Sequence, residues 1–325
     1  MSQTLARLIA VVFLLVPVPV AVEAQEPTRV WRIGFLGSGS YSSGDPRVEA
    51  LRRGLRELGY AEGRNLAFEF RWAGGKADRL PTLAAELAKL KVDAIVTQGT
   101  QATDAARRAV TTIPIVFAVA GDPVGTGLVT SLARPGGNVT GLTDIAPEIA
   151  GKRLELLREA VPGITRIAWN PANPSSAPQM KDTGAVARSF GLSVRSLELG
   201  DVSQLEGAFA TAVQDQARAV IVLSDGALYG RRVQIAELAA KHRLPCVAWT
   251  PEFAESGCLM AYGANVVEMH RRAAVFVDKI LRGASPGGLP VEQPTKFELV
   301  VNLKTERGVS VDSLPREVVP HEVGE

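Results

Sequence analysis

Small polar, acidic and aromatic side chains directly follow several apolar runs of this sequence. They are Ser38, Ser40, Thr100 and Asp122 in the first half, and Asn170, Asp225 and Trp249 in the second. Hydroxyl, carboxylate, amide and indole groups can hydrogen-bond to a small molecule or stack on it, so they commonly line ligand-binding clefts. Local interpretations stay open beside this one. The acidic and hydroxyl residues and Asn170 could cap helices or stabilise turns, and Trp249 could belong to the core.

The known signatures of catalysis and cofactor binding are missing from the sequence. The glycines at 34, 37, 39 and 44 do not form G-x-G-x-x-G, and neither G-x-x-x-x-G-K-[ST], G-x-S-x-G nor S-x-x-K occurs. The histidines (His242, His270 and His321) and the two cysteines have no metal-site spacing. We therefore expect no cofactor, no metal and no catalytic residue, although an enzyme without a known motif stays an alternative.

The first 24 residues resemble a secretory signal peptide. Arg7 precedes an apolar stretch over 8–22, which contains Pro17 and Pro19, and the segment closes on Ala24. We predict cleavage near Ala24, a mature chain from Gln25 and a periplasmic location, with an uncleaved anchor as the alternative. The net charge of +2 argues against a nucleic-acid partner.

Two cysteines, Cys246 and Cys258, each fall in an expected strand. In an oxidising compartment they could pair, and two buried free thiols are the other interpretation. The sequence leaves both open.

Strand and helix patterns alternate along the chain in two successive arrays. The first has expected strands at 29–37, 65–73, 92–99 and 113–120, with helices at 46–60, 77–90 and 100–110. The second has strands at 164–170, 192–199, 218–225 and 244–250, with helices at 177–190, 203–216 and 229–243. This alternation predicts an α/β fold of two doubly wound parallel-sheet lobes.

The last part of the chain adds an expected strand at 258–263, a helix at 266–283 and a strand at 296–304. These are too few for a third domain, so we expect them to return the chain to the first sheet and then to the second by crossing strands. The predicted domains are 1–24 as signal peptide, 25–142 plus 262–288 as N-terminal lobe, and 143–261 plus 289–325 as C-terminal lobe.

A glycine-rich loop joins the two arrays. Asp122 and Pro123 are a strong helix start and predict a helix over 122–133. Beyond it, Gly136, Gly137 and Gly141 could supply the positive φ of a tight crossing, and we predict that they form a hinge.

The segments "TIPIVFAVAGDPVGTGLVTSLARPGGNVTG" and "QPTKFELVVNLKTERG" resemble the ABC transporter substrate-binding protein family, which includes bacterial tryptophan- and tyrosine-binding lipoproteins. The likeness covers nearly the whole mature chain. It implies a type I periplasmic-binding fold that closes on one small ligand and delivers it to an inner-membrane permease with a separate ATPase. Members often hold an aromatic amino acid in small polar loops, which match here at Ser38–Ser40, Thr100, Asp122, Asn170 and Asp225.

The chain departs from these relatives in two respects. It lacks the lipobox cysteine, and the loops "WNPANPSSAPQ" and "SDGALYG" differ from those expected for tryptophan binding. We predict a monomeric solute-binding protein of an ABC importer that takes an amino acid or a small aromatic or carboxylate compound. A periplasmic sensor protein that signals to a separate kinase is the alternative, and a secreted enzyme is less favoured.

Overall fold

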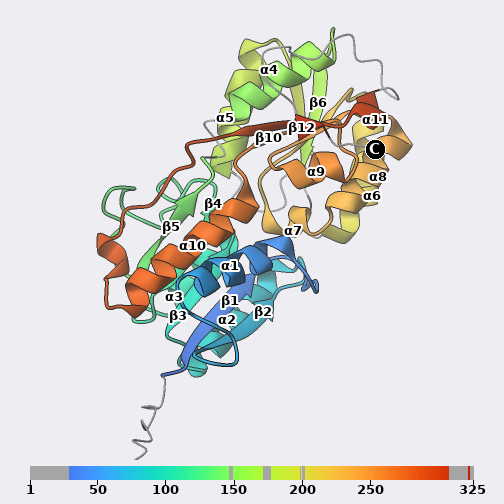
Figure 1. Cartoon of the computed structure of the whole chain (residues 1–325). Helices are drawn as coiled ribbons and strands as arrows, with labels where there is room; N and C mark the ends of the chain where they lie inside the picture. The colour runs from blue at the N-terminus through green and yellow to red at the C-terminus, as the bar shows by residue number, and fades with distance from the viewer. Residues whose placement is uncertain are drawn as a thin grey trace, which may run out of the picture.

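The structure is a computed structural model, and it describes residues 29–145, 149–170, 177–197, 199, 202–306 and 321–322. The expected signal peptide at 1–24 lies outside the described residues. Within them, two sheets form two lobes, and in Figure 1 the lobe that contains the blue N-terminal strands lies below the other. No helix of the described part is long and apolar enough to cross a membrane.

The first lobe is a parallel five-stranded sheet in the described residues, in the order β2-β1-β3-β4-β5. Its strands are β1 (Trp31–Gly37), β2 (Leu66–Trp72), β3 (Ala94–Gln98), β4 (Ile115–Ala120) and β5 (Val139–Thr143). Its helices are α1 (Pro46–Glu57), α2 (Leu80–Lys89) with the short η1 (Ala77–Arg79) before it, and α3 (Thr100–Ala109). The strands expected in this lobe and the helices expected at 46–60, 77–90 and 100–110 are present, and β5 is an additional strand.

The second lobe contains a seven-stranded sheet in the described residues, in the order β12-β11-β10-β9-β8-β6-β7. Its strands are β6 (Arg166–Asn170), β7 (Ser193–Ser196), β8 (Val220–Val222), β9 (Cys246–Ala248), β10 (Met260–Gly263), β11 (Glu298–Val301) and β12 (His321–Glu322). Only the β10–β11 pair is antiparallel among the described pairs. The helices are α4 (Ala150–Ala160), α5 (Ala177–Ser189), α6 (Leu205–Gln214) after η3 (Val202–Gln204), α7 (Gly226–Tyr229), α8 (Arg232–His242), α9 (Pro251–Glu255) and α11 (Leu303–Glu306).

Helix α10 (Val266–Leu281) returns the chain to the first lobe and packs along α1 (Figure 1). A Cβ at Gly54 of α1 would lie 2.4 Å from the Arg271 carbonyl oxygen, so glycine permits this close approach. The Tyr60 hydroxyl also donates to Asp278 Oδ1 at 2.9 Å. These contacts fix α10 to the first lobe, although α10 follows a strand of the second sheet.

The chain passes back to the second lobe after η4 (Pro286–Gly288). Val291 N still donates to the Leu132 carbonyl at 2.7 Å, and Glu292 N donates to the Gly141 carbonyl at 3.0 Å. Both contacts belong to the first lobe. We therefore propose that the last crossing begins after Glu292 rather than at 289.

The helix expected over 122–133 is wrong, because this segment forms turns instead. Asp122 does begin a turn, since its Oδ1 accepts from Gly125 N at 2.7 Å and its carbonyl accepts from Thr126 N at 3.1 Å. Gly127 then adopts φ +71°, which breaks the helical path after one turn. Asp122 and Pro123 thus begin a helical turn, and Gly127 prevents that turn from continuing as a helix.

Cys246 and Cys258 form a disulfide, which resolves the open choice in favour of pairing. Cys246 begins β9 as expected, whereas Cys258 lies in the loop just before β10. The bond closes the segment that contains Trp249 and α9.

Candidate ligand-binding cleft

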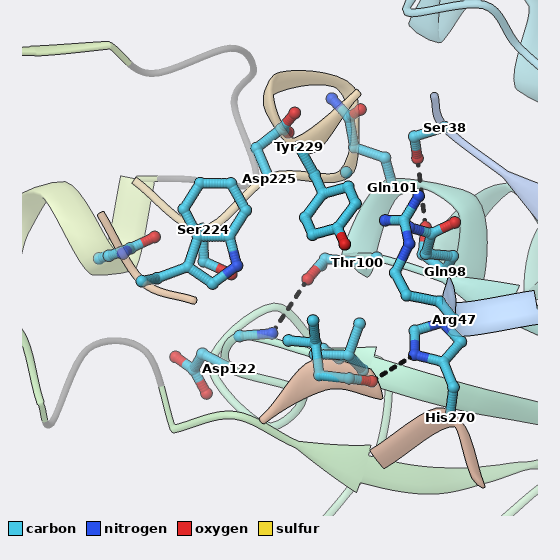
Figure 2. A pocket seen from close by; sticks show the side chains of 18 residues that line it. Ser38, Arg47, Gln98, Thr100, Gln101, Asp122, Ser224, Asp225, Tyr229 and His270 are labelled. Atoms are coloured by element: carbon cyan, nitrogen blue, oxygen red, sulfur yellow. Dashed lines mark hydrogen bonds between the residues drawn. The ribbon is translucent and has the colours of Figure 1, made fainter. Parts of the chain in front are cut away.

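A cavity lies between the two lobes, where the strands of both sheets end at their carboxyl edges. Residues that follow β1, β3 and β4 line one side, and residues that follow β8 and β9 line the other (Figure 2). The cavity and its mouth hold about 700 Å³ of space without protein atoms, and this volume includes open solvent. Its position is the usual one for ligands of open α/β sheets.

Most of the sequence-predicted site residues line this cavity. Ser38, Thr100, Asp122, Asp225 and Trp249 all lie in its wall. Ser40 is exposed and does not reach the wall. Asn170 ends β6 at the same edge of the sheet, and its side chain lies outside the described part of the chain.

Helix α3 directs its N-terminus at the cavity. Its N-cap is Gly99, at φ +91°, so no side chain caps the first amide groups. Thr100 is the first helical residue, and its Oγ1 accepts from Gly121 N at 3.4 Å. The N-cap interpretation of Thr100 is therefore wrong. Thr100 and Gln101 both line the cavity, so the positive end of the helix dipole is available to an anion there.

Each lobe contributes one carboxylate to the cavity wall. Asp122 comes from the loop after β4 and accepts from Gly125 N. Asp225 follows β8 and caps α7, because its Oδ1 accepts from Ala227 N at 2.7 Å and Leu228 N at 3.0 Å. The two carboxylates, one from each lobe, therefore face the same space.

Two aromatic side chains of the second lobe border the cavity. Trp249 is 4% exposed, and its ring centroid lies 4.5 Å from that of Phe253. Trp249 therefore belongs both to the core and to the cavity wall, so both roles considered from the sequence apply to it. Tyr229 of α7 is the second aromatic residue, and sequence reasoning gave it no role in the site.

Arg47, which sequence reasoning missed, connects the lobes at one side of the cavity. It is 4% exposed, and its Nη2 lies 2.6 Å from Asp45 Oδ2. Its guanidinium carbon stands 3.7 Å from the ring centroid of Tyr229 in the opposite lobe. Burial raises the pKa of Asp45, but hydrogen bonds and charge from Arg47 outweigh it and leave the pKa below its usual value. With its amide oxygen turned to Arg47, Gln98 also accepts from Nη2 at 3.0 Å.

Further polar residues also line the wall. Gln101, Gln179 and His270 were missed, and Ser224 lies beside the predicted Asp225. The Ser224 hydroxyl donates to Asp144 Oδ2 at 2.7 Å, and Asp144 lies where the chain leaves β5 for the second lobe.

The predicted hinge glycines lie inside the first lobe. Gly136 and Gly137 have φ of +73° and +63° in the loop before β5. Gly141 lies within β5, where a Cβ would stand 2.0 Å from the Phe117 carbonyl oxygen. These positions require glycine for local geometry, while their part in hinge bending stays a prediction.

The sequence matches the family model described as ABC transporter substrate binding protein over residues 40–316. A tyrosine-binding protein of Clostridioides difficile strain R20291 is 24% identical over 291 residues, which cover 89% of this chain and 84% of the relative. The structure is similar to a conserved domain protein from Vibrio cholerae, with a TM-score of 0.83 at 24% identity, covering 90% of this chain and 99% of that one.

A second solved structure is an ABC domain from Streptococcus pneumonia in complex with L-Trp. It gives a TM-score of 0.79 at 23% identity and covers 89% of this chain and 99% of that chain. Two α/β lobes with a cleft between them form the type I periplasmic-binding fold. The chain belongs to the ABC transporter substrate-binding protein family.

Proposed function

We propose that this protein is the solute-binding component of an ABC import system and that it holds an amino acid, or a small aromatic carboxylate, between its lobes. One observation carries the proposal: a single cavity joins the uncapped N-terminus of α3, one carboxylate from each lobe, and the indole of Trp249. Family membership supports it, as do two similar proteins, the tyrosine-binding protein of Clostridioides difficile and the ABC domain in complex with L-Trp.

The residues that line the cavity indicate how such a ligand binds. The ligand carboxylate accepts from the amide groups at the start of α3, beside Thr100. An ammonium group lies toward Asp122 and Asp225. An apolar or aromatic side chain then packs on Trp249, whose own position is fixed by Phe253.

Ligand binding closes the lobes in this proposal, because the groups that contact the ligand come from both of them. A ligand that touches both lobes favours the closed form by the difference in its affinity for the two states. Arg47 on Tyr229 is a direct contact between the lobes in the structure, as is the approach of Gly39 to Gly226. The closed lobes would then present a joint surface to the permease, which works with its ATPase in the inner membrane.

The compartment follows from the same proposal. We propose export by the segment 1–24, cleavage near Ala24 and a monomeric protein in the periplasm. The Cys246–Cys258 disulfide supports an oxidising compartment, since such bonds seldom persist in the cytosol.

A thermal-shift screen of the chain from Gln25 tests the function. The panel contains amino acids, aromatic acids, dicarboxylates, sugars and nucleosides. A ligand at about a hundred times its dissociation constant adds roughly 2.7 kcal/mol of stability, so we expect a higher melting temperature with an amino acid or an aromatic acid. Mass spectrometry should recover that ligand unchanged, whereas a converted ligand would indicate an enzyme. A folded protein that responds only to sugars or nucleosides would contradict the proposal.

A further inference from the structure

Three buried polar atoms in the cavity wall have no hydrogen-bond partner within the described part of the chain. One is Gln179 Nε2, and the other two belong to opposite lobes. They are the hydroxyl of Tyr229, whose residue is 2% exposed, and Nε2 of His270, whose residue is 0% exposed. A buried polar group without a partner is costly, and native proteins seldom leave one unless a ligand or a water completes it. These two atoms come from opposite lobes, since α7 belongs to the second and α10 packs on the first.

The hydrogen-bonding role of His270 follows from its other ring nitrogen. Nδ1 lies 2.7 Å from the Val266 carbonyl oxygen, which can only accept, so Nδ1 carries the proton. Burial and the charge of Arg47 lower the pKa of His270 to about 4, so the ring is neutral at pH 7. In the neutral ring Nε2 is then an acceptor, and no residue in the described part of the chain donates to it.

Arg47 does not supply that donor. Its Nε and Nη2 donate to Asp45 at 3.0 and 2.6 Å, and its remaining nitrogen faces the Gln98 amide oxygen. Figure 2 shows Arg47 between the Tyr229 ring and the His270 ring, with the Tyr229 hydroxyl turned to the part of the cavity beside Thr100. Burial raises the pKa of Tyr229, so its hydroxyl keeps its proton.

We infer that His270 and Tyr229 form a subsite for a hydroxyl group of the ligand, an alcohol or a phenol, and that this subsite determines specificity. A hydroxyl has a proton that it can donate to an acceptor such as His270 Nε2 and lone pairs that can accept from a donor such as the Tyr229 hydroxyl. A carboxylate cannot donate to His270, and a methyl or plain phenyl group would leave both protein atoms without partners. The inference rests on the proposed function and adds to it the chemical group that the cleft selects.

The test uses two matched pairs of probes that differ by one phenolic hydroxyl. They are L-tyrosine with L-phenylalanine, and 4-hydroxyphenylacetate with phenylacetate. Sites built to bind a hydroxyl reject the analogue without it by up to about 10⁵-fold. By isothermal titration calorimetry we expect the hydroxylated member of at least one pair to bind the full mature chain on the order of 10²-fold or more tightly.

Variants then assign the preference to the two residues. His270→Phe removes the acceptor and should reduce the ratio of dissociation constants to below about threefold, largely by weakening the hydroxylated probe. Tyr229→Phe keeps the ring under Arg47 and removes only the hydroxyl, so it tests the subsite even if His270→Phe fails to fold. Gln179→Leu is the matched control, because Gln179 is a 5% exposed residue of the same cavity whose Nε2 also has no described partner. A Gln179 variant should weaken both members of a pair alike.

The outcomes separate the two proposals. Binding of both members of each pair with equal affinity would overturn the hydroxyl subsite and leave the proposed function intact. A preference that survives in both Tyr229→Phe and a folded His270→Phe would also overturn it. If the folded chain binds none of the four probes and no amino acid, the proposed function fails and the inference fails with it.

Discussion

Asp225 combines a structural role with a proposed role in binding, and two substitutions can separate them. Asp225→Ala removes the cap of α7 and should lower the free energy of unfolding by about 1 kcal/mol. Asp225→Asn keeps a capping oxygen but removes the charge, so we expect near-normal stability with weaker binding of an amino acid. Denaturant unfolding and calorimetry on the same samples measure both. Unchanged affinity in Asp225→Asn would remove this carboxylate from ligand binding.

His270 should make the stability of the protein depend on pH. Burial lowers its pKa to about 4, against 6.5 for an unperturbed histidine. Between these values the unfolded chain binds a proton that the folded chain does not, so the free energy of unfolding falls as the pH falls from about 6.5 to 4. The full effect is about 3 kcal/mol.

Asp45 acts in the same direction, because its lowered pKa stabilises the fold above the pKa of an unfolded aspartate and this stability is lost on acidification. Urea unfolding from pH 7 to 4 measures the sum. In His270→Phe the slope between pH 6.5 and 5 should become shallower. An identical slope in the variant would show that His270 titrates normally in the folded protein.

At the scale of elements, two helical glycines make a matched pair of substitutions. Gly54→Ala places a Cβ 2.4 Å from the Arg271 carbonyl and should destabilise the protein by about 1–3 kcal/mol, because α1 and α10 would have to separate. Gly207 of α6 has nothing within 4 Å of its Cβ position, so Gly207→Ala should stabilise by up to about 1 kcal/mol. Equal effects of the two, measured by thermal unfolding, would contradict the tight packing of α10 on α1.

The sequence predicted the repeated strands and helices because their apolar residues have a clear period, but it could not predict elements without such a signal. β5 is a short strand that contains Gly141, and α9 has only five residues. The same Asp-Pro start precedes α1 and the turn at 122, and only Gly127, at φ +71°, makes the second one stop. Local patterns show where a helix can begin better than where it must end.

The candidate site was predicted in its loop residues and missed in its helical ones. Ligands gather at the carboxyl ends of parallel strands, so residues at those ends could be predicted from the strand pattern. They are Ser38, Thr100, Asp122 and Asp225. Arg47 and His270 lie on helices, where a charged or polar residue is usually exposed to solvent. Their burial arises from contacts between α1, α7 and α10, which are far apart in sequence. No pattern in a single sequence reveals such contacts.

At the scale of the whole molecule, the contact between the lobes at Gly226 should control closure. A Cβ there would lie 3.4 Å from Ser38 Cβ, so the larger side chain of Gly226→Leu should keep the lobes apart. We expect small-angle scattering of this variant to show little compaction on addition of ligand, together with weaker binding. Gly207→Leu places the same side chain away from the cleft and should compact normally. Compaction of both variants alike would show that this contact does not limit closure.

The disulfide between Cys246 and Cys258 makes the segment that contains Trp249 a covalent ring. A chain that is still reduced has no such ring, so its Trp249 loop has more conformational freedom to lose when a ligand binds. Under the proposed function, the protein therefore reaches its full ligand affinity only after translocation and after oxidation of the two cysteines. A precursor waiting in the cytosol would compete poorly for the amino acids around it, and the protein would become a strong binder only in the compartment where it works.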